Sequence, residues 1–137
     1  MKNNSTASAM AIILALVLSA NEFLDLLMSL LNYFFPPAYG EYLSPSSYAI
    51  ITLFYLFFAF LFLAIAIGVY RKRAWAFTLG VFSVIAWAAW LLAFYAILLP
   101  TDANYPPIEK TIQLVTYLTP AAALLGMLLL EKNSLKN

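Results

Sequence analysis

The chain of 137 residues is 65% hydrophobic and 9% charged, whereas soluble domains carry about a quarter charged residues, so this composition is typical of a membrane protein. Its net charge of +1 argues against nucleic acid as a partner, because nucleic-acid binding needs a basic face. Histidine and cysteine are absent, which excludes disulfides, Cys/His zinc sites, thiol catalysis, histidine-ligated haem and histidine-containing catalytic triads.

Four segments are apolar and long enough to cross a bilayer, which takes about 20 residues of helix. In chain order they are residues 7–35, 48–70, 74–99 and 108–130. Prolines, a glycine and charged residues in "FFPPAYGEYLSPSS", "RKR" and "PTDANYPP" interrupt the helices between them. No repeat or linker divides the chain. The sequence therefore predicts one all-α domain, residues 1–137, built as a bundle of four transmembrane helices.

The basic residues are distributed unevenly over the connections between these segments. A lysine precedes the first segment, two lysines follow the fourth, and Arg71, Lys72 and Arg73 join the second to the third. With four spans, these three places lie on the same side of the membrane, and the positive-inside rule makes that side cytoplasmic. The sequence thus predicts a multi-pass protein of the cell membrane whose N- and C-termini are both cytoplasmic.

The first segment carries two acids at bilayer depth. Four of its polar residues share one helix face, since they are spaced 3, 4 and 3 residues apart: Glu22, Asp25, Ser29 and Asn32. Because lipid leaves polar groups without hydrogen-bond partners, we expect this face to turn toward the other three helices. Small residues at positions 8, 11 and 15 continue the same face toward the N-terminus.

Counting inward from the segment ends places hydroxyl groups and aromatic rings at the depth of the two acids. These residues are Tyr55, Trp87, Trp90, Thr116 and Tyr117. We expect no lysine or arginine of the chain to reach the acids, because a lysine side chain spans only about one helical turn from a helix end. Desolvation penalises a charged carboxylate. At least one acid should therefore be protonated at rest, unless a cation, water or a basic residue of another chain meets it.

Three interpretations of the acids remain open. They form a proton or cation site, they contact a partner subunit, or they make interhelical hydrogen bonds, which contribute about 0.6 kcal/mol on average. No metal site is expected, because a hard divalent ion takes about six oxygen ligands and this layer supplies mainly hydroxyls.

Small residues four apart allow helix backbones to approach closely. They occur in the half of the bilayer nearer the predicted cytoplasmic side, as Ala64-xxx-Gly68, Ala76-xxx-Gly80 and Ala122-xxx-Gly126. The opposite half carries the acids and large aromatic residues, and Pro120 lies inside the fourth segment. The sequence predicts a bundle that is closed on the cytoplasmic side and wider on the other.

The composition favours a non-catalytic accessory subunit of a larger membrane complex, since the soluble parts are short and catalytic sequence motifs are absent. Such a subunit could still belong to an enzyme complex. A second interpretation is a small transporter or a proton or cation conduit that uses Glu22 and Asp25. A third is a lipid- or quinone-binding protein. The expected partners are membrane lipid and either protein subunits or further copies of the chain, with no cofactor and no nucleic acid.

Overall fold

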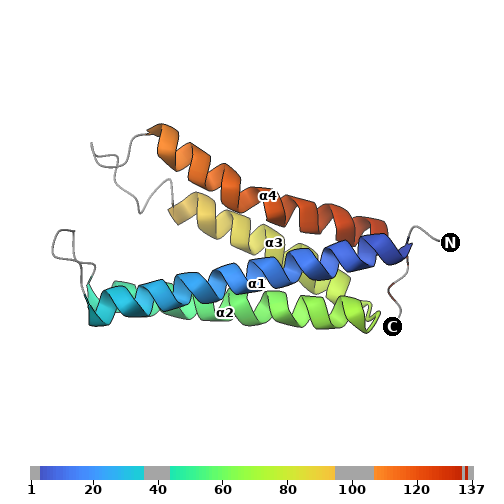
Figure 1. Cartoon of the computed structure of the whole chain (residues 1–137), viewed down its shortest axis with the longest axis horizontal. Helices are drawn as coiled ribbons and strands as arrows, with labels where there is room; N and C mark the ends of the chain where they lie inside the picture. The colour runs from blue at the N-terminus through green and yellow to red at the C-terminus, as the bar shows by residue number, and fades with distance from the viewer. Residues whose placement is uncertain (1–3, 36–43, 95–106, 134, 136–137) are drawn as a thin grey trace.

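The computed structural model describes residues 4–35, 44–94, 107–133 and 135 (Figure 1). Its helices are, in chain order, α1 (Asn4–Phe34), α2 (Pro45–Tyr70), α3 (Trp75–Ala93) and α4 (Pro107–Glu131). All four are long and apolar enough to cross a membrane. The predicted all-α fold with four such helices is confirmed, while residues 95–99, the predicted end of the third segment, lie outside the described residues.

The helices form a ring in which each packs against its neighbours in the order α1, α2, α3, α4. Figure 1 shows the start of α1, the α2–α3 turn and the end of α4 gathered at one end of the bundle. We call this the basic end, because Arg71, Lys72, Arg73 and Lys132 lie there. Toward the opposite end, α4 diverges from α1 and α2 (Figure 1), and we call this the open end. The bundle is therefore closed at one end and wider at the other, as the sequence predicts.

The core of the bundle includes two alanines of α1 that pack against large residues of other helices. Ala11 and Ala15 have no exposed surface and belong to one buried cluster with Phe62 and Ile65 of α2 and Leu124 of α4. Because alanine carries a single methyl group, α1 can approach its neighbours closely along this stretch. This packing closes the half of the bundle nearer the basic end.

Two of the three predicted small-residue pairs lie at helix contacts. A Cβ atom added to Gly68 would lie 2.7 Å from the Cβ atom of Ala76, and one added to Gly80 would overlap the side chain of Leu128. The third prediction is wrong, because Gly126 has nothing within 4 Å of its added Cβ and Ala122 is exposed.

The reason for this failure lies in the rotation of α4 about its own axis. The buried residues of α4 recur at helical spacing as Ala121, Leu124 and Leu128, so this face meets the core. Ala122 and Gly126 lie on a different face of the same helix, which points outward. The small-residue pattern alone does not indicate which face of an apolar helix is turned inward.

The glycine contacts predict a contrast between two alanine substitutions. Gly68→Ala should lower the thermal unfolding midpoint in detergent, because overpacking against the Cβ atom of Ala76 and the ring of Trp75 costs about 1–3 kcal/mol. Gly126→Ala should leave the midpoint unchanged or raise it, since alanine is favoured over glycine in helices by about 1 kcal/mol. Equal loss of stability in both variants would contradict the assigned helix contacts.

Candidate functional site

The polar face of α1 turns toward the other helices as predicted, except at Asn32. Ser19 Oγ donates a hydrogen bond of 2.8 Å to a backbone carbonyl of α2. Glu22 accepts one of 2.8 Å from the indole of Trp87 on α3. Ser8 Oγ donates one of 2.6 Å to Glu131 at the end of α4. Each of these polar side chains of α1 therefore has a partner inside the protein, which lipid could not supply.

Among these three polar side chains of α1, Glu22 is the most deeply buried, with 2% of its surface exposed. Its partner Trp87 is 1% exposed, and the indole ring packs edge-on against Phe62 with ring centroids 6.0 Å apart. An indole N–H can only donate, so Glu22 supplies the acceptor that a buried tryptophan needs. The interpretation of interhelical hydrogen bonding thus fits Glu22 Oε1.

Asp25 lies three residues further along α1 and is half-buried. Its Oδ2 atom accepts a hydrogen bond of 3.3 Å from the side-chain amide of Asn21. Asp25 and Glu22 line one cavity of about 50 Å³, whose other walls are Tyr55, Trp87, Trp90, Leu91, Phe94 and Tyr117. A water molecule needs about 10–15 Å³ of such space. The cavity can therefore hold a few water molecules or one small cation beside the acids.

Six of the nine residues predicted for the site line this cavity: Glu22, Asp25, Tyr55, Trp87, Trp90 and Tyr117. Ser29 is buried but faces α2, where its hydroxyl lies 3.0 Å from that of Thr52. Asn32 is exposed, and so is Thr116, whose hydroxyl donates to Ile112 O at 2.8 Å within α4. Asn32 therefore does not face the interior, where α1 and α4 diverge toward the open end (Figure 1), and Thr116 lines a separate groove beside α1 instead of the acid cavity.

Sequence reasoning missed two apolar walls of the cavity, Leu91 and Phe94. A signal for them existed, since they follow Trp87 by four and seven residues and so share its helix face. A further contact positions Trp90, whose ring stacks on Phe54 with centroids 4.0 Å apart and planes 5° apart. The aromatic walls are therefore held in place by packing with α2.

Neither acid of the cavity forms an ion pair with a described side chain. Within the described residues, the ion pair of the bundle joins Lys72 Nζ to Glu131 Oε2, 3.6 Å apart at the basic end. The side chain of Lys110 lies outside the described residues. Arg71, the other cation considered from the sequence, is exposed at the basic end. The expectation that helix-end cations do not reach Glu22 and Asp25 is therefore met for Arg71, and for Lys110 it stays a prediction.

The ion pair belongs to a second polar cluster that sequence reasoning missed. Glu131 has no exposed surface, and Lys72 Nζ donates a hydrogen bond of 2.8 Å to Ser8 Oγ, which in turn donates to Glu131. The cluster joins α1, the α2–α3 turn and α4. A signal was present, because an acid in the last turn of a helix opposes the helix dipole and so indicates an interaction elsewhere.

The backbone of the α2–α3 turn directs Lys72 into this cluster. The N–H of Arg73 donates to Gly68 O at 2.9 Å and the N–H of Lys72 to Val69 O at 3.0 Å, which is a Schellman motif. Lys72 occupies its left-handed position with φ 55°, where glycine is usual. The left-handed conformation costs a non-glycine residue about 1–2 kcal/mol. The contacts of the Lys72 side chain offset this cost.

Comparison with known proteins finds no matching family model, curated protein or solved structure. The function of the chain is therefore argued from the chemistry and geometry of its own site.

The bond between Trp87 and Glu22 predicts a stability difference between two tryptophan variants. Trp87→Phe should lower the unfolding midpoint, because interhelical hydrogen bonds contribute about 0.6 kcal/mol on average and up to about 1.7. Glu22→Gln should stay close to wild type, since the amide oxygen still accepts from the indole. The matched control is Trp75→Phe, at an exposed tryptophan of the basic end. Equal midpoints for the two tryptophan variants would contradict a stabilising bond.

The second cluster predicts rescue by a double substitution. Lys72→Met should destabilise the bundle by about 1–3 kcal/mol, because it removes the positive charge beside a buried carboxylate. Adding Glu131→Gln should recover most of that loss, as the amide can still accept from Ser8. Lys132→Met serves as the control, at an exposed lysine of the same end. Chemical unfolding of the three variants tests this, and a double variant no more stable than Lys72→Met contradicts it.

Proposed function

We propose that this chain is a small transporter or conduit that takes up a proton or small cation at Glu22 and Asp25. The observation that carries the proposal is the placement of both acids in one cavity within an apolar bundle, without an ion pair to any described lysine or arginine. Ionisable residues at bilayer depth are costly and commonly mark ion pathways. An interhelical hydrogen bond accounts for Glu22 Oε1, whereas the bond that Asp25 accepts comes from Asn21 of the same helix and does not join two helices.

The chemistry of the cavity suits a positive species. Two carboxyl groups close together share protons as a coupled pair, or hold a cation between them. The aromatic walls add to this preference, because the faces of Trp87, Trp90 and Tyr117 can attract a cation by about 0.5–2 kcal/mol. Charge and ring chemistry therefore both favour a cation over an anion.

The shape of the bundle is compatible with one state of an alternating-access cycle. The half nearer the basic end is closed by packing around Ala11 and Ala15, whereas the helices diverge toward the open end (Figure 1). Pro120 lies inside α4 and cannot donate a backbone hydrogen bond, and the hydroxyls of Thr116 and Thr119 bond back to carbonyls of the preceding turn. Proline and such hydroxyl bonds bend helices. The first half of α4 is therefore suited to move relative to α1.

We propose that the basic end faces the cytoplasm, with both termini on that side of the cell membrane. Arg71 and Arg73 are exposed there, and Lys132 Nζ lies 5.4 Å from the ring centroid of Phe77. The positive-inside rule supports this orientation. The acidic cavity then opens away from the cytoplasm.

A role as an accessory subunit has separate support from the outer surface of α2. Its exposed apolar side chains line a shallow groove of about 450 Å³, formed by Leu53, Leu56, Phe57, Phe60, Leu61 and Ala64. A helix of a larger complex could pack there, as could lipid. Purification from native membranes in mild detergent separates the two functions. Stoichiometric recovery with other subunits favours the accessory role, and recovery alone or as a symmetric oligomer favours transport.

Flux measurements in proteoliposomes test the transport proposal. Vesicles with a trapped pH dye report proton flux, and labelled tetramethylammonium reports cation uptake. Glu22→Gln and Asp25→Asn should reduce one of these fluxes about tenfold or more, as a rise of about 1.4 kcal/mol in the barrier would do. The control is Glu131→Gln, which removes a carboxyl group outside the cavity and should keep the flux. Folded variants of both acids with wild-type flux would overturn the proposal.

A further inference from the structure

We propose that the substrates are lipid-soluble amines in their cationic form, protonated or quaternary, and that they reach the acids sideways from the bilayer through a groove between α1 and α4. This inference rests on the proposed function and names its substrate class. The groove has a volume of about 320 Å³, several times that of the acid cavity. Its walls include Val17, Asn21, Ile112, Gln113, Tyr117 and Pro120.

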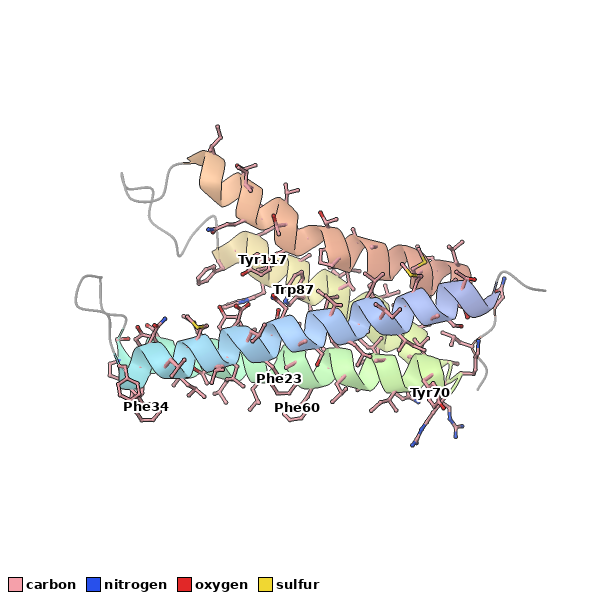
Figure 2. The ribbon with its side chains drawn as sticks, in the orientation of Figure 1. Phe23, Phe34, Phe60, Tyr70, Trp87 and Tyr117 are labelled. Atoms are coloured by element: carbon pink, nitrogen blue, oxygen red, sulfur yellow. The ribbon has the colours of Figure 1, made fainter. Side chains whose placement is uncertain are left out.

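The groove and the acid cavity share a wall. Tyr117 lines both of them, and in Figure 2 it lies close to Trp87 in the space between α4 and α1. Asn21 lines the groove, and its amide donates to Asp25 in the cavity at 3.3 Å. Tyr117 and Asn21 therefore connect the groove to the acid cavity, the first as a shared wall and the second through its bond to Asp25.

The two volumes suit the two parts of an amphipathic cation. The cavity of about 50 Å³ has room for a small charged group but not for an organic body, whereas the groove of about 320 Å³ holds an apolar tail or ring. An ammonium group would meet Glu22 and Asp25 and the aromatic walls around them, which favour a positive charge. A neutral amphiphile would leave this charge complementarity unused, and an anion would be repelled. The shape and the charge together select an amine.

The direction of access follows from the exposure of the groove. Val17 is 52% exposed and Ile112 is 61% exposed, so both edges of the groove reach the outer surface of the bundle. In a chain of this composition that surface meets lipid rather than water. A substrate that partitions into the bilayer can therefore enter without passing through the open end.

Binding measurements in phosphatidylcholine nanodiscs test the inference with three probes. These are decyltrimethylammonium, tetramethylammonium, which lacks the tail, and 1-decanol, which lacks the charge. The chain has three tryptophans, so a Trp75→Phe background leaves Trp87 and Trp90 as fluorescent reporters beside the cavity. Val17→Phe and Ile112→Phe fill the groove. Val115→Phe is the matched control, at an exposed valine of α4 that does not line the groove.

We expect both groove-filling variants to bind decyltrimethylammonium about tenfold more weakly or worse, a change of about 1.4 kcal/mol, while Val115→Phe binds it like wild type. Tetramethylammonium has no tail, so a folded groove variant should still bind it. A groove variant that no longer binds tetramethylammonium is misfolded, and the other groove variant then tests the inference. Asp25→Asn should weaken both ammonium probes and leave any 1-decanol signal unchanged.

Two results overturn the inference in distinguishable ways. Wild-type decyltrimethylammonium binding in a folded groove variant shows that amines do not use the groove, while the cation site itself stands. Ammonium binding that is unchanged in folded Asp25→Asn and Glu22→Gln removes the cation site, and the proposed function fails with it. Binding of 1-decanol as tight as that of the amine would assign the groove to neutral lipid tails and also overturn the inference.

Discussion

Hydrocarbon offers no hydrogen-bond partners, and this constraint decides which face of α1 turns inward. The polar side chains of that face find partners on the other helices: a carbonyl of α2 for Ser19, an indole of α3 for Glu22, and a carboxyl group of α4 for Ser8. The helix is thus oriented by hydrogen bonds, because lipid supplies no hydrophobic driving force between helices. The position of the acid cavity follows from that orientation.

The two ends of the bundle differ in structure: one is tightly packed, and the other holds the acid cavity. Near the basic end, small residues bring backbones together and the Lys72–Glu131 pair ties the α2–α3 turn to α4. Toward the open end, large aromatic residues and the divergence of α4 leave room for a cavity and a groove (Figure 1). A rigid half beside a hollow half allows a polar site to exist at bilayer depth without loss of the fold.

Depth along the membrane could be predicted from the sequence, whereas rotation and tilt of the helices could not. Spanning helices run roughly parallel, so counting from their ends placed Trp87, Trp90 and Tyr117 beside the acids correctly. Asn32 and Thr116 are exposed because inter-helix angles are set by packing, which spacing along one helix does not encode. Gly126 faces outward for a related reason, since an apolar helix shows no preferred face. Glu131 was missed because the predicted fourth segment ended at residue 130, while α4 continues to Glu131.

The central claim is that Glu22 is held by the indole of Trp87 and not by any lysine or arginine among the described side chains. Solid-state NMR distance measurement in lipid tests it directly, with ¹³C in glutamate carboxyl groups and ¹⁵N in either the tryptophan indoles or the lysine and arginine side chains. Glu22→Gln identifies the Glu22 signal by its loss. The account predicts dipolar coupling of Glu22 to an indole nitrogen that disappears in Trp87→Phe, and lysine coupling at Glu131 instead. Coupling of the Glu22 carboxyl to a lysine or arginine nitrogen would contradict the account.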